Sequence, residues 1–115
     1  MGINMGFDWI KEFPAAITVC DRQGVVVAMN DKACVTFANE GGAALIGHSL
    51  KDCHKPESWQ KILTMLDTGK ANTYTIEKHG VRKLIHQQPW FLDGKVAGVV
   101  EMSIELPEDM PHYVR

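Results

Sequence analysis

The sequence predicts an α+β fold, a five-stranded antiparallel sheet with helices on one face. The last third of the chain, residues 72–104, contains three alternating apolar and polar runs separated by His79-Gly80 and Asp93-Gly94. An X-Gly pair between alternating runs is typical of a two-residue hairpin turn, because glycine adopts positive φ at little cost. A shorter hairpin precedes a helical segment, and strands that flank helices rather than alternate with them are typical of an α+β fold.

The composition is that of one globular domain. The chain has 115 residues, of which 45% are hydrophobic and 23% charged, and its formal net charge is −2. The mixture of charges argues against a nucleic-acid partner, and no apolar run has transmembrane length or a signal-peptide pattern. The three cysteines lack CxxC spacing and fit a reducing compartment. We therefore expect a cytoplasmic protein without nucleic-acid or membrane partners.

The chain is expected to begin with an amphipathic cap, which we assign to residues 1–13. Its apolar residues are too many for a segment alone in water, so it should pack on the sheet or on a partner's copy. Residues 15–21 and 25–29 are predicted to form two strands, because the segment between them begins with Asp and ends with Gly, as turns do.

Helices are predicted between the two groups of strands. Asn30 or Asp31 is a suitable N-cap for the first helix. Pro56 suits the first turn of a longer helix, and Gly69 is its stop. Apolar residues at i, i+3, i+4 and i+7 spacing give this helix one buried face, formed by Trp59, Ile62, Leu63 and Leu66.

Two-residue turns fix the pairing of the last three strands by counting. The first turn pairs Lys78 with Val81, Glu77 with Arg82, Thr75 with Leu84 and Thr73 with His86. The second turn pairs His86 with Glu101, Leu84 with Ser103 and Ile85 with Met102.

This register gives the sheet an apolar core face, which carries Tyr74, Ile76, Ile85, Phe91, Val96, Val100 and Met102, with Lys83 near its end. Asn72 and Gln87 lie on the same face in one row with Val100. Buried amides need hydrogen-bond partners, so these two are either satisfied core groups or polar contacts for a ligand in a small cavity. A bulge near Pro89 would bring His86 and Gln88 inward in place of Gln87.

Several motifs at the joints of these elements stand in a particular order. They are residues 16–25 (AITVCDRQGV), Asn30, residues 45–50 (LIGHSL), residues 53–57 (CHKPE) and residues 93–100 (DGKVAGVV). This ordered set resembles the PAS domain family over about residues 13–105. We assign the PAS-like domain to residues 14–106 and a short tail to residues 107–115. The family's usual Asp-Ile-Thr ending is absent.

The resemblance implies a sensory or dimerising module, not an enzyme, with a pocket between the helices and the sheet. We expect a small-molecule sensor that acts in signal transduction by homodimer rearrangement and passes its signal to a downstream protein. The expected ligand-binding residues are Asn72, Tyr74, Gln87, Ile85, Val100, Met102, Trp59, Ile62 and Leu63. A dimerisation module with a filled core and a haem-binding sensor are the alternatives.

The cofactor is left open by the sequence. Family members bind haem, flavin or small metabolites, and flavin photochemistry uses a Cys in an Asn-Cys-Arg-Phe-Leu-Gln run that is absent around Cys34. Haem needs an axial ligand that faces an apolar cavity, and His54 is the candidate because Cys53-His54 partly resembles iron-associated relatives. No zinc-finger spacing, hydrolase motif or phosphate loop is present, so we expect neither a metal site nor catalysis.

The outer sheet face is expected to be covered, because it carries a tryptophan and other large apolar residues. The 7–13 segment of the same chain or of a second subunit is the expected cover. The predicted homodimer interface comprises Phe7, Trp9, Ile10, Leu84, Trp90 and Val99.

Overall fold

The structure, a computed structural model, describes residues 7–52 and 54–115. The first six residues of the predicted cap and Cys53 of the Cys53-His54 pair lie outside these ranges. The regular elements are β1 (Ala16–Asp21), β2 (Val26–Met29), α1 (Asp31–Thr36), α2 (Pro56–Thr68), β3 (Asn72–Lys78), β4 (Val81–Leu92) and β5 (Lys95–Glu105). Short 3₁₀ helices at Ala38–Glu40, Gly42–Leu45 and Leu50–Asp52 connect α1 to α2.

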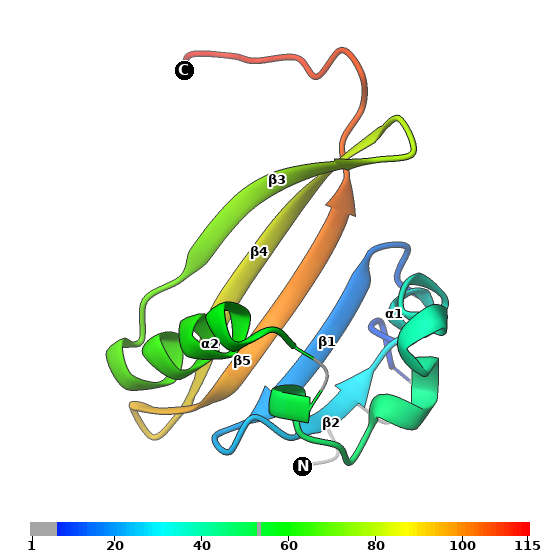
Figure 1. The fold of residues 1–115 in the computed structure, drawn as a ribbon. Coiled ribbons are helices and arrows are strands. Elements are labelled where there is room, and N and C mark those ends of the chain that lie inside the picture. The colour runs from blue at the N-terminus through cyan, green and yellow to red at the C-terminus, as the bar shows by residue number, and fades with distance from the viewer. Residues whose placement is uncertain (1–6, 53) are drawn as a thin grey trace.

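The strands form one antiparallel sheet in the order β2-β1-β5-β4-β3, so the predicted fold class is confirmed. Figure 1 shows α2 crossing the sheet near the β4–β5 turn and α1 beside β1 and β2. The far halves of β3, β4 and β5 extend beyond both helices (Figure 1). Within the described residues, no helix is long and apolar enough to cross a membrane.

The two helices begin at the expected residues. The Asn30 side chain caps α1 by accepting from the Ala33 N–H at 3.0 Å. Pro56 occupies the first turn of α2, and Gly69 ends it with φ of +73° and an N–H donated to the Met65 carbonyl.

The predicted buried face of α2 was wrong in part. Ile62, Met65 and Leu66 are buried against the sheet, whereas Leu63 is 38% exposed. Trp59 is only partly buried and lies over the β1–β2 turn, where a Cβ on Gly24 would come within 2.7 Å of its ring. The buried stripe of α2 therefore contains Met65 in place of Leu63. The side of the helix that faces the sheet is rotated toward Met65 relative to the side predicted from the spacing.

Both hairpins of the last three strands have two-residue turns, as predicted. His79-Gly80 and Asp93-Gly94 have positive φ at both residues, the geometry of a type I′ turn. The β3–β4 register is confirmed throughout, with Thr73 opposite His86 at one end and Lys78 opposite Val81 at the other.

The predicted β4–β5 register was wrong by one residue. Trp90 pairs with Gly98 but Phe91 pairs with Val96, so Ala97 is an extra residue of β5 and forms a bulge. Beyond the bulge, His86 pairs with Met102, Leu84 with Ile104 and Ile85 with Ser103.

The bulge exchanges the two faces of β5. Val99, Glu101 and Ser103 now lie on the inner face, which the helices cover, and Val100 and Met102 lie on the outer face. Because the extra residue is in β5 rather than β4, Gln87 stays inside and does not give way to His86 and Gln88. The predictions of Val100 and Met102 as core-face residues and of Val99 as an outer-face residue were therefore wrong.

Gly98 permits a contact that crosses β5 beside the bulge. The Trp90 indole Nε1–H donates to the Cys20 carbonyl of β1 at 3.1 Å. A Cβ on Gly98 would stand only 1.9 Å from that carbonyl oxygen and 2.5 Å from Trp90 Nε1. Glycine inside a strand often marks such a close approach, and here any side chain would displace the indole or β1.

The hydrophobic core lies between α2 and the inner face of β1 and β5. Its buried residues are Cys20, Ile62, Met65, Leu66 and Val99, and the partly buried Leu50, Trp59 and Val96 pack against them. These residues lie at the end of the sheet near the β4–β5 turn. The core therefore does not cover the inner face of the far halves of β3, β4 and β5.

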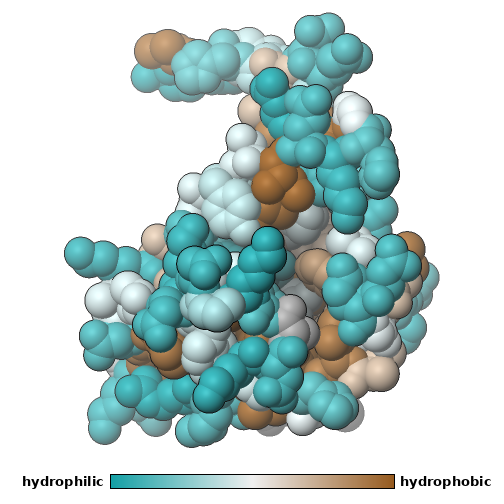
Figure 2. Space-filling model, viewed as in Figure 1, coloured by the Kyte–Doolittle hydropathy of each residue, from teal (hydrophilic) through white to brown (hydrophobic). Residues whose placement is uncertain are grey.

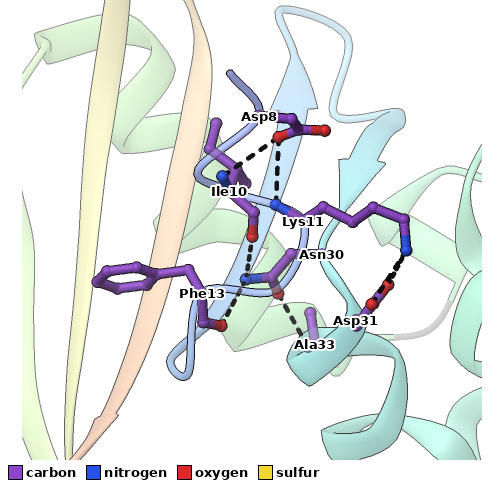
Figure 3. A network of polar contacts seen from close by, with 7 residues as sticks. All are labelled: Asp8, Ile10, Lys11, Phe13, Asn30, Asp31 and Ala33. Atoms are coloured by element: carbon purple, nitrogen blue, oxygen red, sulfur yellow. Dashed lines mark hydrogen bonds and ion pairs between the residues drawn. The ribbon is translucent and has the colours of Figure 1, made fainter. Parts of the chain in front are cut away.

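A single buried side chain joins the N-terminal segment, β1 and α1. Asn30 is 3% exposed, and its Oδ1 accepts from the N–H groups of Ile17 and Ala33. Its Nδ2 donates to three carbonyls, those of Ile10 at 3.0 Å, Phe13 at 3.3 Å and Ala15 at 2.8 Å. Figure 3 shows this amide between the N-terminal segment and α1, with the Lys11–Asp31 ion pair beside it.

We predict that Asn30→Asp destabilises the protein by about 3 kcal/mol, measured by urea unfolding. The substitution keeps the acceptor oxygen but places a second oxygen opposite three carbonyls, with no N–H left to donate. Asn39→Asp makes the same chemical change at an exposed residue and should alter stability by less than about 0.5 kcal/mol. Equal stabilities of the two variants would contradict this role of Asn30.

Candidate functional site

A cavity of about 410 Å³ lies against the inner face of the sheet. All five strands contribute to one wall, and α2 and the 3₁₀ helices between α1 and α2 supply the other. Figure 2 shows apolar side chains, in brown, exposed on this face between hydrophilic ones. The cavity is open to solvent where Tyr74 and Ile76 are 42% and 38% exposed.

Apolar side chains form much of the cavity wall. Those from the helical segment are Phe37, Leu45, Leu50, Ile62 and Met65, and those from the sheet include Val26, Ile76, Ile85 and Val99. This composition can hold an apolar ligand body of small size.

A row of three polar side chains crosses the sheet within the cavity. Asn72 Nδ2 donates to Gln87 Oε1 at 2.9 Å, and Gln87 Nε2 donates to Glu101 Oε2 at 2.8 Å. The residues come from β3, β4 and β5, and each pair is directly opposite in the sheet. The sequence predicted the two amides in this row but placed Val100 where the bulge puts Glu101.

Tyr74 and Cys20 also line the cavity, and both have altered acidity. Burial raises the pKa of the Tyr74 phenol, and the negative charge of Glu101 raises it further. Burial is the main cause of the raised pKa of the Cys20 thiol. The carboxylate of Glu101 therefore acts on groups beyond its direct hydrogen bond.

The structure brings together only some of the predicted ligand-binding residues. Asn72, Tyr74, Gln87, Ile85 and Ile62 line the cavity. Trp59 packs against the core at the β1–β2 turn and Leu63 is exposed, so neither lines the cavity. Val100 and Met102 are on the outer sheet face.

Sequence reasoning missed Glu101 and Ser103, which line the cavity from β5, and Thr18 from β1. The signal that could have found the two β5 residues is Gly98, because an isolated glycine inside a strand pattern indicates a bulge.

The residues of the predicted dimer interface do not all lie on one face of the sheet. Leu84 and Trp90 lie on the outer face, but Val99 is 6% exposed and belongs to the core. Phe7, Trp9 and Ile10 are 65%, 49% and 39% exposed.

The N-terminal segment covers one end of the outer face within the same chain. Asp8, Ile10 and Lys11 line a second cavity with Ile17, Val19 and Ala28 of β1 and β2. Ile17, on the outer side of β1, is consequently only 4% exposed. The outer side of β5 is next to this region, since Met102 is directly opposite Ile17 and Val100 is opposite Val19, and β4 lies beyond β5.

The histidines do not form an evident cofactor site. His54 reaches the cavity edge but is an exposed residue of the loop before α2, whereas an axial haem ligand needs an apolar setting. His86 lies on the outer face, where its Nδ1 is 2.8 Å from Thr73 Oγ1 and its Nε2 is 3.2 Å from Gln88 Oε1. Among the described residues, no three His, Cys, Asp or Glu side chains gather in a way that could hold a metal ion.

The sequence model of the PAS fold matches residues 10–109. The chain belongs to the PAS family. PAS domains are generally sensory modules rather than enzymes, and this chain is a PAS sensor domain. No curated protein matches it.

Solved PAS structures are similar to this chain. VqmA of Vibrio cholerae, described as a dimer and a LuxR-type receptor, has a TM-score of 0.65 and 19% identity over 87% of this chain and 49% of its own. The Vibrio cholerae Aer2 receptor, a dual PAS-heme oxygen sensor, has a TM-score of 0.59 and 12% identity over 81% of this chain and 95% of its own. The PAS domain of the histidine kinase ThkA has a TM-score of 0.61 and 20% identity over 78% of this chain and 97% of its own. This chain spans about half the length of VqmA.

We predict that Glu101→Gln lowers the pKa of Tyr74. Removing the negative charge makes the phenolate less unfavourable, while burial continues to hold the pKa above its ordinary value. A Tyr113→Phe background leaves Tyr74 as the sole tyrosine, so ultraviolet absorbance reports its titration directly. Glu77→Gln, on the outer face of β3, should leave the pKa unchanged, and a fall of the same size in both variants would refute the effect.

Proposed function

We propose that this PAS domain binds a small molecule in the cavity and transmits the signal by rearrangement of a homodimer to a downstream signalling protein. The observation that carries the proposal is the cavity of about 410 Å³, whose apolar walls meet a polar row in the sheet. Pockets of this kind typically use apolar walls for affinity and a few polar groups for orientation. A dimerisation module with a filled core would not need this space.

The comparisons support the same kind of activity. VqmA has been solved bound to DPO, and that structure has a TM-score of 0.67 and 19% identity to this chain. Because the identity is low, the likeness supports binding by a similar fold and does not indicate the same ligand.

The outer face of β4 and β5 supports homodimerisation. It presents four apolar side chains that are not among the residues lining the cavity beside the N-terminal segment, namely Leu84, Val100, Met102 and Ile104. Ile104 is 37% exposed, and the other three are partly buried. A second copy of the same surface would remove these groups from water.

The ligand proposal is tested by screening small fragments against the native protein and Gln87→Leu. The substitution leaves Asn72 and Glu101 without their shared partner, so fragments that shift the amide signals of the cavity strands should bind about tenfold more weakly. Gln88→Leu, the adjacent residue on the outer face, should bind as the native protein does. Absence of any fragment bound in the cavity of the native protein would reject the proposal.

The dimer proposal is tested by sedimentation of Leu84→Lys. A buried ammonium at the interface should raise the dimer dissociation constant by about 30-fold, equivalent to ~2 kcal/mol. Val35→Lys is the matched control, because Val35 is an apolar residue of α1 that is 72% exposed and is not part of the outer sheet face. A Leu84→Lys dimer as stable as the control would show that another surface is used.

A further inference from the structure

The carboxylate of Glu101 fixes the orientation of the whole polar row. An ionised carboxylate only accepts hydrogen bonds, so Gln87 must direct its Nε2 toward Glu101. The Oε1 of Gln87 then points toward Asn72, which must donate with its Nδ2. Every donor of the row therefore points toward β5, and the row ends in the only charged group among its members.

Glu101 has a negative charge without an ion-pair partner among the described residues. Among the residues that the structure describes, the ion pairs join Lys11 to Asp31 and Lys32 to Glu105, and neither pair includes Glu101. The other titratable residues that line the cavity and can be charged at neutral pH are Glu40, His54, Lys61, Lys78 and Lys83. Lys61 and Lys78 are exposed, so their ammonium groups are solvated. Lys83 is partly buried, but it is opposite Glu105 in the sheet and forms no ion pair with Glu101. A partly buried carboxylate without a cation is a favourable place for a cationic ligand group.

The neighbours of Glu101 complete a small polar site. Gln87 holds Oε2, and Oε1 has no hydrogen bond among the described residues. Thr18 of β1 is directly opposite Glu101 and lines the same cavity, so its hydroxyl is a second acceptor on the other side. The negative charge of Glu101 also adds to the effect of burial in raising the pKa of Tyr74, which lies two strands away in the same cavity.

We infer that the ligand carries a cationic head group with N–H donors, such as a primary ammonium or an amidinium, next to a small apolar body. The head group binds Glu101 Oε1 and the Thr18 hydroxyl, and the body packs against apolar wall residues such as Ile62, Met65 and Ile85. This inference rests on the proposed ligand-binding function and names the chemistry of its ligand.

Three probes with one aromatic body test the head group: benzylamine, benzyl alcohol and phenylacetate. Each is titrated into the native protein, and the amide shifts of β1, β4 and β5 locate and quantify binding. Benzylamine should bind about tenfold more tightly than the neutral and anionic probes, because a charged hydrogen bond is added. Glu101→Gln should abolish this preference.

Two further variants separate the charge from general effects. Glu77→Gln makes the same change in net charge on the outer face of β3 and should retain the preference for benzylamine. Thr18→Val removes the hydroxyl with little change of shape and should weaken benzylamine alone, which tests the site even if Glu101→Gln fails to fold.

The outcomes distinguish this inference from the proposed function. Equal or tighter cavity binding of benzyl alcohol or phenylacetate would overturn the cationic head group while leaving a ligand pocket in place. Retention of the preference by Glu101→Gln would also overturn it. If none of the probes and none of the screened fragments shifts the cavity amides, the ligand-binding function itself fails.

Discussion

The hydrogen bond from the Trp90 indole to the Cys20 carbonyl ties β4 to β1 across the strand that separates them. The indole can reach β1 only because Gly98 of β5 has no side chain beneath it. The extra residue, Ala97, immediately precedes this crossing point. The contact and the bulge together set which side of β5 faces the helices, and the positions of the cavity and the outer apolar surface follow from that.

The bulge gives each face a different chemical character. Val99 enters the core, while Glu101 and Ser103 line the cavity next to apolar walls. Without the bulge, Val100 and Met102 would take the inward places and Glu101 would lie opposite His86 on the outer face. The sheet side of the cavity would then lack a carboxylate, and the outer face would lose part of its apolar surface.

Much of the fold could be predicted because local signals were unambiguous. The X-Gly turns fixed the β3–β4 register, and Asn30, Pro56 and Gly69 marked helix ends through capping chemistry. Asn72 and Gln87 were correctly placed on the inner face, because both lie in the β3–β4 hairpin, whose register depends only on the first turn.

The remainder of the site could not be predicted from local patterns. The apolar residues of β5 beyond the bulge, Val100, Met102 and Ile104, alternate with polar ones, so the pattern favours a register without a bulge. Only the long-range contact of Trp90 with β1 beside Gly98 favours the register that the structure has. Similarly, Leu63 has helical spacing with Trp59 and Met65 has it with Ile62, and contact with the sheet buries Met65 rather than Leu63. Whether a residue faces a cavity thus depended on contacts between distant parts of the chain.

The Asn30 amide also determines how the molecule loses order. It holds backbone groups at Ile10, Phe13, Ala15, Ile17 and Ala33 through one buried side chain. If any one of these segments opens, the Asn30 amide loses some of its hydrogen bonds and holds the other segments less firmly. The free energy of opening therefore falls for all of them together. The N-terminal segment, the start of β1 and the start of α1 therefore form one cooperative unit in hydrogen exchange, although 23 residues of sequence separate Ile10 from Ala33.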